Sequence, residues 1–186
     1  VYNSSSNVTT DLSDTAADDW IVNGMFSMPS LAFDSSNDLV YLAALTPPDY
    51  DGALGVYDPS TNVTTDLSGT FEMTGMFVTA SDNIYATCFD PANNLVYLGL
   101  RNGKFGVYDV GDDVVYDLSS TDTGDWMSTR DVYSLAYDSS NDLIYIGVQA
   151  GEYGVYNRTS NVSTDLSDTD PGNWISSSSL RSFVVD

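Results

Sequence analysis

Carboxylates are the side chains of this sequence that are most able to do chemistry. There are 27 Asp and Glu against 5 Lys and Arg, and there is no His. Without His the chain has no Ser–His pair, no imidazole base and no zinc or iron site built on His. Paired Asp residues could serve a glycosidase or a calcium-dependent hydrolase or lyase. The acids recur as turn residues, however, so no pair is singled out and we expect a protein that is not an enzyme.

The acceptor sequence of N-glycosylation, Asn-x-Ser/Thr, is a second recurring feature. It occurs at Asn3, Asn7, Asn62, Asn157 and Asn161. Three of these residues (Asn7, Asn62 and Asn161) lie five residues after a recurring Tyr, and Asp113 takes that place in the remaining copy. A recurrent acceptor at an exposed hairpin tip is what glycosylation requires. The alternative is that Asn is a good turn residue and Thr a good strand residue.

Acidic loops that end in Trp are the candidate metal and ligand sites. Residues 120–126 read Ser-Thr-Asp-Thr-Gly-Asp-Trp, residues 168–174 read Asp-Thr-Asp-Pro-Gly-Asn-Trp, and a looser copy lies at 14–20. One interpretation is an acidic turn that anchors its Trp against the next structural unit. A second is calcium ligation, which suits carboxylates on a flexible turn, and a third is a sugar stacked on the indoles. The calcium candidates are Asp122, Asp125, Asp168 and Asp170, and the stacking candidates are Trp20, Trp126 and Trp174.

Three further acidic turns follow strand-like segments, at residues 34–38, 90–94 and 138–142. Each turn begins with Asp and has Asn at its fourth position. An Asp side chain can accept hydrogen bonds from the backbone N–H groups that follow it, which gives a self-contained Asx turn. Calcium bound by these turns is the alternative interpretation.

A repeat of about 50 residues positions these side chains. Tyr2, Tyr57, Tyr108 and Tyr156 are spaced by 55, 51 and 48 residues, and Asp-Leu-Ser begins nine residues after each. Within each unit, short runs rich in Val, Ile and Tyr alternate with turn residues, which predicts strands joined by hairpins. The predicted strands are 30–33, 39–45, 54–57 and 63–67 in the first complete unit, 84–89, 95–100, 105–108 and 114–118 in the second, and 132–137, 143–148, 153–156 and 162–166 in the third.

Four short strands in a unit of this length predict a propeller blade, because one such sheet cannot bury both faces without neighbours. We therefore expect an all-β protein, a β-propeller built of four-stranded antiparallel blades, with three complete blades and a split fourth. The expected blades span 25–68, 75–119 and 130–167. The split blade has its outer strands at 1–13 and its inner strand at 178–186. The small residues Ala32, Cys88, Ala136 and Val184 fit an innermost strand near the axis.

The split blade lacks its second strand in this arrangement. An open blade edge is a pairing template that proteins normally protect. Three explanations compete. The chain is part of a longer propeller, or neighbouring subunits supply the missing strand, or the ring is a distorted four-bladed one.

Residues 89–99 (Phe-Asp-Pro-Ala-Asn-Asn-Leu-Val-Tyr-Leu-Gly), followed by Gly-Val-Tyr-Asp at 106–109, resemble the repeats of YVTN-type and two-component-regulator-type propellers. The resemblance covers all three complete units. It implies the propeller fold and an extracellular, surface-layer-like setting, and no catalytic residue of these families maps onto the chain. The loops 120–126 and 168–174 look like the Asp-box of sialidase-type propellers, but they are one residue shorter and lie between blades.

Charge and composition narrow the classes of partner. The net charge of −22 argues against binding to nucleic acid or to an anionic membrane, since both need clustered Lys or Arg. No stretch approaches the ~18 apolar residues of a membrane span, so no membrane insertion is expected. The single Cys, Cys88, cannot form an intrachain disulfide, and its repeat position predicts a small packed side chain.

Together these features predict a non-catalytic structural or interaction protein that is extracellular or on the cell surface. We expect it to be glycosylated and to assemble into a filament or layer by completing the split blade between subunits. Its expected partners are further copies of the chain, and glycans. The first alternative is a glycan- or ligand-binding propeller that uses the Trp and Asp loops. The second is a calcium-dependent hydrolase or lyase, and calcium is the only cofactor that the sequence suggests.

Overall fold

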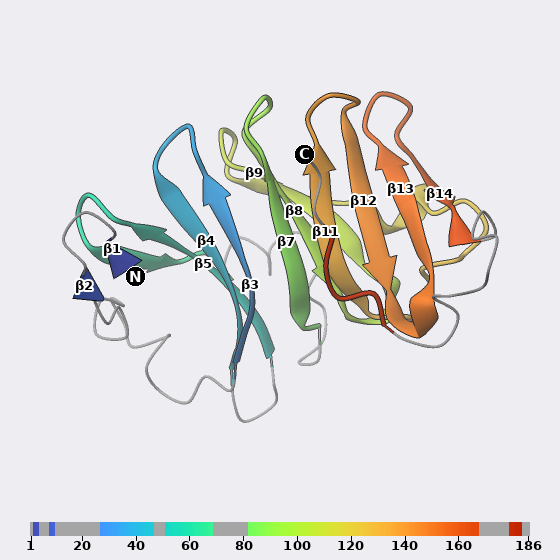
Figure 1. The fold of residues 1–186 in the computed structure, drawn as a ribbon, viewed down its shortest axis with the longest axis horizontal. Helices are drawn as coiled ribbons and strands as arrows, with labels where there is room; N and C mark the ends of the chain where they lie inside the picture. Colours follow the sequence, from blue (N-terminus) through green and yellow to red (C-terminus); the bar gives the residue numbers. More distant parts are fainter. Residues whose placement is uncertain are drawn as a thin grey trace.

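The fold is all-β and is built from a series of similar sheets. The structure is a computed structural model that describes residues 2–3, 8–9, 27–46, 51–68, 82–167 and 179–183. It contains three antiparallel four-stranded sheets and one two-stranded sheet (Figure 1). The all-β prediction and the three four-stranded units are confirmed, whereas closure of these units into a propeller stays a prediction. The described residues include no helix that is long and apolar enough to cross a membrane.

Each four-stranded sheet follows the order of the chain, so every strand pairs with the next one in sequence. The first sheet comprises β3 (Ser27–Asp34), β4 (Leu39–Thr46), β5 (Asp51–Asp58) and β6 (Val63–Asp66). The second comprises β7 (Ile84–Asp90), β8 (Leu95–Leu100), β9 (Phe105–Asp109) and β10 (Val114–Asp117). The third comprises β11 (Val132–Asp138), β12 (Leu143–Val148), β13 (Tyr153–Asn157) and β14 (Val162–Asp165). Short 3-10 turns lie at η2 (Arg101–Gly103), η3 (Ser119–Thr121) and η4 (Gln149–Gly151).

The two-stranded sheet is a further copy of the outer hairpin. It consists of β1 (Tyr2–Asn3) and β2 (Val8–Thr9), which pair Tyr2 with Thr9. The same register pairs Tyr57 with Thr64 and Tyr156 with Ser163. The repeat therefore extends to the N-terminal hairpin, as the Tyr spacing predicts.

Asp residues close the inner hairpin of each sheet by the Asx-turn geometry that the sequence predicts. Asp34 Oδ1 accepts the N–H groups of Ser36 and Asn37 at 2.8 and 3.1 Å, and Oδ2 accepts Asn37 Nδ2 at 2.8 Å. Asp90 and Asp138 make the same three bonds in the second and third sheets. All three carboxylates are buried, and both oxygens of each one are used within its own turn.

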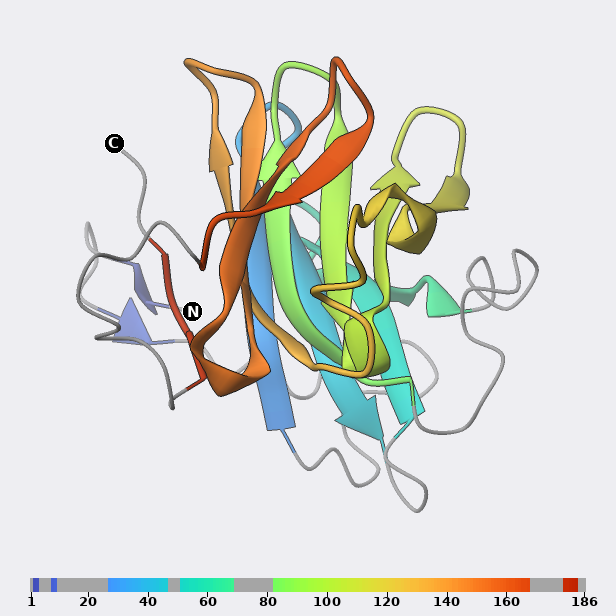
Figure 2. The ribbon, with the colours of Figure 1, turned by 90° about the vertical axis from the view of Figure 1, so that its right-hand side faces the viewer.

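Consecutive sheets pack face to face around aromatic residues of the second strand. Tyr41 of the first sheet stacks on Phe89 of the second, with ring centroids 6.3 Å apart, and meets the edge of Tyr108 at 6.2 Å. Tyr97 of the second sheet meets Tyr156 of the third at 6.1 Å. Tyr41 and Tyr97 are each 1% exposed, so these rings lie in the cores between sheets. In Figure 2 the orange third sheet lies in front of the green second sheet and the blue first sheet.

A small residue in the second strand lets the next sheet approach. Ala43, Gly99 and Gly147 share one repeat position. A Cβ atom added at Gly99 would lie 2.5 Å from Val132 Cγ1, at the start of the next inner strand. A Cβ atom at Gly147 would lie 2.9 Å from the Phe183 ring. The space for a larger side chain is therefore filled at Gly99 by Val132, and at Gly147 by Phe183 together with Ser134 Oγ of the same sheet.

Residues 179–183 pack on the third sheet without forming a strand of their own. Ser134 Oγ donates to the Leu180 carbonyl at 2.8 Å, and the rings of Tyr145 and Phe183 are 6.1 Å apart. In Figure 1 this dark red segment lies beside β11, near the middle of the molecule, and the dark blue hairpin β1–β2 lies at the left edge. The described residues form three full four-stranded sheets, and the split blade stays a prediction.

Replacing Gly99 with Ala tests the packing between sheets. We expect Gly99→Ala to lower the free energy of unfolding by about 1–3 kcal/mol, because the added methyl group overlaps Val132 and overpacks the core. Gly111→Ala is the matched control, since its Cβ meets only Asp109 Oδ1 at 3.4 Å in an exposed turn. Denaturant titration of both variants measures the difference. Equal stabilities of the two variants would contradict the close approach.

Buried tyrosines predict instability in alkali. Burial and the nearby Asp90 carboxylate raise the pKa of Tyr137 to about 12, and burial also raises the pKa of Tyr41 and Tyr97. The folded state therefore favours the neutral phenol. Its stabilising effect is complete below about pH 10, the pKa of an unfolded Tyr, and is lost as the pH rises through about 12. We expect Tyr137→Phe to lose less stability over this interval than the wild type, measured by denaturant titration at each pH.

Candidate functional site

The recurring sequon Asn has a structural task in the outer hairpin turn. Asn62 and Asn161 have φ values of 57° and 55°, and Asp113 has 53°, in the left-handed region that Asn and Asp tolerate best. The hydroxyl groups of Tyr57 and Tyr156 donate to Asn62 and Asn161 Oδ1 at 3.1 and 2.9 Å. Tyr108 donates to Asp113 Oδ1 at 2.9 Å. The position thus needs a short acceptor that accepts this backbone, which explains why Asp replaces Asn once.

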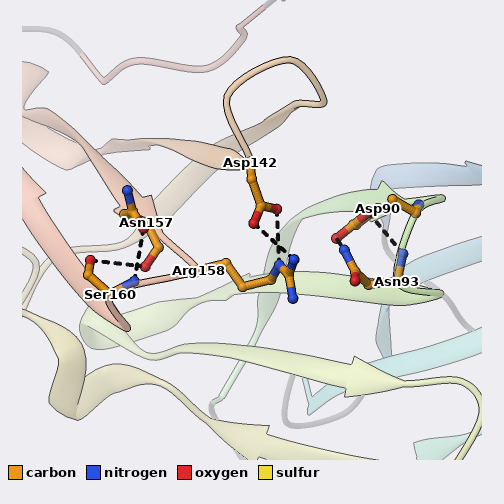
Figure 3. A network of polar contacts seen from close by, with 7 residues as sticks. Asp90, Asn93, Asp142, Asn157, Arg158 and Ser160 are labelled. Carbon is orange, nitrogen blue, oxygen red and sulfur yellow. Dashed lines mark hydrogen bonds and ion pairs between the residues drawn. The ribbon is translucent and has the colours of Figure 1, made fainter.

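The same turns leave the sequon acceptors accessible. Asn62 and Asn161 are exposed, while the third residues of their sequons, Thr64 and Ser163, are buried. The tyrosine bond uses the amide oxygen, and a glycan is attached through the amide nitrogen. Glycosylation therefore stays a prediction that is compatible with the turn. Asn157 Oδ1 accepts the Ser160 N–H at 3.0 Å in its own turn (Figure 3).

The side chains of the two remaining sequon residues are not described. Asn3 lies in β1, where only its backbone is placed, and Asn7 lies outside the described residues.

The loop at 120–126 packs its tryptophan into the core. Trp126 is 6% exposed, and a Cβ atom at Gly154 of β13 would lie 2.5 Å from its Cζ2 atom. Thr123 Oγ1 donates to the Ser163 carbonyl at 2.7 Å, which ties the loop to β14 of the next sheet. This is the anchoring role that one interpretation of the loop predicts. Trp20 and Trp174 lie outside the described residues.

The calcium candidates are only partly described. Asp122 Oδ2 accepts the Met127 N–H at 2.9 Å, and burial raises the pKa of this carboxyl group. Asp125 is exposed, and Asp168 and Asp170 lie outside the described residues. In the part of the chain that the structure describes, no group of three or more His, Cys, Asp or Glu is placed to hold a metal ion. Calcium binding stays a hypothesis.

The sequence interpretation missed a hollow where the inner strands converge. This cavity of about 470 Å³ is lined by Pro29, Leu45, Tyr85, Tyr133 and Arg181. Four of these residues share one repeat position, five residues before Asp34, Asp90, Asp138 and Asp186. The repeat therefore brings them together from β3, β7, β11 and the segment 179–183. A signal was present in the sequence, since this position carries Pro, Tyr, Tyr and Arg in otherwise similar units.

We call this cavity the axial hollow. Aromatic and cation–π contacts hold the side chains that line it. The rings of Tyr85 and Tyr133 are 5.1 Å apart and tilted by 51°. The guanidinium carbon of Arg181 lies 4.6 Å from the centre of the Tyr133 ring, within range of a cation–π interaction. Tyr133 donates to Asp131 Oδ2 at 3.0 Å, and Asn83 Nδ2 donates to the Tyr85 hydroxyl at 3.1 Å. Burial, followed by the bond to Asp131, raises the pKa of Tyr133.

Positive charge is gathered at the end of the sheets that carries the axial hollow. Four of the five cations lie in loops or strand starts at this end: Arg101, Lys104, Arg130 and Arg181. Lys104 pairs with the buried Asp82 at 2.6 Å, and Arg130 pairs with Glu152. The fifth cation, Arg158, lies at the opposite end and pairs with Asp142 at 2.9 Å, facing the Asp90 turn (Figure 3). The end that carries the acidic turns thus has one cation.

Comparisons with protein-family models and with curated proteins find no match for this chain. The resemblance to YVTN-type repeats stays a prediction. A blade pattern alone does not define an activity, since function depends on the site that a fold carries.

Asn62 and Asn161 allow the turn role to be separated from glycosylation. We expect Asn62→Asp and Asn161→Asp to keep the free energy of unfolding within about 0.5 kcal/mol of the wild type, because Asp113 already fills the same role. Asn62→Ala should cost about 1–2 kcal/mol, since it loses the Tyr57 bond and strains the backbone. Denaturant titration of unglycosylated protein decides this. If Asn62→Ala is as stable as Asn62→Asp, the turn role is wrong.

Proposed function

We propose that this protein is a non-catalytic interaction module of the cell exterior that associates with further copies of itself. The proposed contact is the outer face of the inner strand β3. The observation that carries the proposal is the exposure of two large apolar side chains there. Leu31 is 57% exposed and Phe33 is 56% exposed.

The counterparts of these two residues are covered by the preceding sheet. Thr87 occupies the position of Leu31, and its N–H and hydroxyl groups each bond Ser30 Oγ at 2.9 Å. Phe89 occupies the position of Phe33 and stacks on Tyr41. In the third sheet, Leu135 is buried at the position of Leu31. In the other units, the positions of Leu31 and Phe33 are thus packed against a preceding unit.

The other end of the series has a complementary face. Tyr145 occupies the position of Tyr41 and Tyr97 but is only half-buried, although Phe183 lies against it. Residues 179–183 lie against the third sheet, where they contact Ser134 and Tyr145. We propose that this segment of one copy packs on β3 of a second copy. Two different faces then meet, so the contact is head-to-tail and yields either a closed ring or a filament.

Three further observations support an exterior, non-catalytic setting. The carboxylates that close the inner hairpins accept hydrogen bonds from their own turns, so their role there is structural. Asn62 and Asn161 present sequons at exposed hairpin tips. The net charge of −22 favours solubility and opposes non-specific contacts. Self-repulsion of this size would also make association sensitive to salt.

Ligand binding is the second candidate function, and the axial hollow favours it. The loops that combine Trp and Asp support it less, because Trp126 lies in the core. A calcium-dependent hydrolase or lyase would need several acids around one point. The described residues contain no group of three or more acids placed to hold a metal ion.

Association can be tested by placing charge on the exposed face. We expect wild-type protein to form oligomers as concentration and salt rise, and the double variant Leu31→Asp, Phe33→Asp to stay monomeric under the same conditions. Sedimentation velocity measures both. Tyr116→Asp is the matched control, because Tyr116 is 48% exposed on the edge strand β10 and should assemble like wild type.

Circular dichroism should be unchanged in all variants, because the replaced side chains are exposed. Wild-type protein that is monomeric at every concentration and salt would refute the proposed self-association. Assembly of the double variant equal to that of the wild type would refute the proposed face.

A further inference from the structure

We infer that the axial hollow binds a ring-shaped ligand that carries one carboxylate, and that this ligand is a single uronic acid with no further charge. The side chains that line the hollow differ from Leu31 and Phe33 of the proposed contact, although Arg181 lies in segment 179–183 and Pro29 lies in β3. The inference depends on the chemistry of three side chains that line the cavity: Tyr85, Tyr133 and Arg181.

The hollow is half-open, since Pro29 and Arg181 are exposed, and it has the size of a small-molecule site. Its volume of about 470 Å³ lies within the roughly 300–1,000 Å³ of known ligand pockets. Pro29, Leu45 and the two tyrosine rings offer apolar surface to the C–H face of a sugar ring. The tilt of 51° between Tyr85 and Tyr133 makes an angled wall. Such a wall suits a ligand with a flat face.

The polar groups of the lining suit a carboxylate. Among the described residues no carboxylate pairs with Arg181, and its guanidinium is held over the Tyr133 ring at 4.6 Å. The ring fixes the guanidinium and leaves its N–H donors for another partner. The Tyr85 hydroxyl accepts from Asn83, so its own proton can be donated to a ligand.

The neighbouring charges limit the ligand to a low charge. Lys104 and Arg130 are occupied by Asp82 and Glu152, which leaves Arg181 as the cation that lines the cavity. Asp131 lies behind Tyr133 and holds its hydroxyl group. One guanidinium neutralises one carboxylate, whereas a polyanion would be repelled by a protein of charge −22. A cationic ligand would face Arg181 itself.

The hydroxyl groups of a sugar distinguish it from other ring carboxylates. The Tyr133 hydroxyl donates its proton to Asp131, so its oxygen can accept a hydrogen bond from a ligand. The site thus offers a donor at Tyr85, an acceptor at Tyr133 and a cation at Arg181. A uronic acid presents hydroxyl groups, an acceptor and a carboxylate on one ring.

Calorimetric titration with sodium glucuronate and sodium galacturonate tests the inference, with glucose and acetate as comparisons. We expect saturable binding of at least one uronate and much weaker binding of glucose and acetate. Arg181→Gln should weaken uronate binding on the order of 10- to 100-fold, the effect of one hydrogen bond to a charged group. Arg101→Gln is the matched control, because Arg101 is at the same end but does not line the cavity. It should bind within about twofold of wild type.

The titration also has outcomes that overturn the inference. Absence of saturable uronate binding, equal binding of glucose, or binding unchanged in Arg181→Gln would each refute it. Benzoate that binds as tightly as the uronates would show that the site recognises any ring carboxylate, which overturns the assignment to a sugar. Binding of tetramethylammonium in place of the uronates would show that the tyrosine pair is a cation site. Titrating the Leu31→Asp, Phe33→Asp variant in parallel keeps binding separate from association.

Discussion

The close approach of consecutive sheets is the constraint on which the rest of the structure depends. A four-stranded sheet of short strands cannot cover both of its faces, so each unit needs a neighbour. Ala43, Gly99 and Gly147 provide the space, and Tyr41 and Tyr97 fill the cores that result. The Asx turns and the Tyr–Asn bonds then hold each hairpin in the shape that this packing requires.

Two consequences follow from packing units in series. The first sheet leaves Leu31 and Phe33 uncovered, and the third leaves Tyr145 half-buried, so the series has two unlike open faces. The inner strands also bring one repeat position together from four places in the chain, and this position lines the axial hollow. Association and ligand binding therefore arise from the same repeat, and they use different side chains of β3 and of segment 179–183. Association uses Leu31 and Phe33, which no preceding sheet covers. Ligand binding uses the repeat position that carries Pro, Tyr, Tyr and Arg.

Much of the fold could be predicted from local chemistry. Alternation of apolar and turn residues located all twelve strands of the three complete units, and Asp followed by Asn three residues later located the inner turns. Anchoring of Trp126 was one of three interpretations that the sequence left open, and the packing of its ring against Gly154 agrees with it. The axial hollow was missed because its residues are about 50 residues apart and meet only once the sheets are stacked. The exposure of Leu31 could not be predicted either, since the Leu at the same position of the third unit is buried.

Cysteine crosslinking tests most directly whether one copy covers the first sheet of another. By repeat equivalence with the bonded pair Ser30 and Thr87, Leu31 of one copy should lie against Ser182 of a second copy. The native Cys88 is half-buried and burial raises the pKa of its thiol, so it should react slowly. Mixed Leu31→Cys and Ser182→Cys single variants should form a disulfide-linked dimer under mild oxidation. The absence of this dimer, with a disulfide that forms only within one chain of the double variant, would contradict the account.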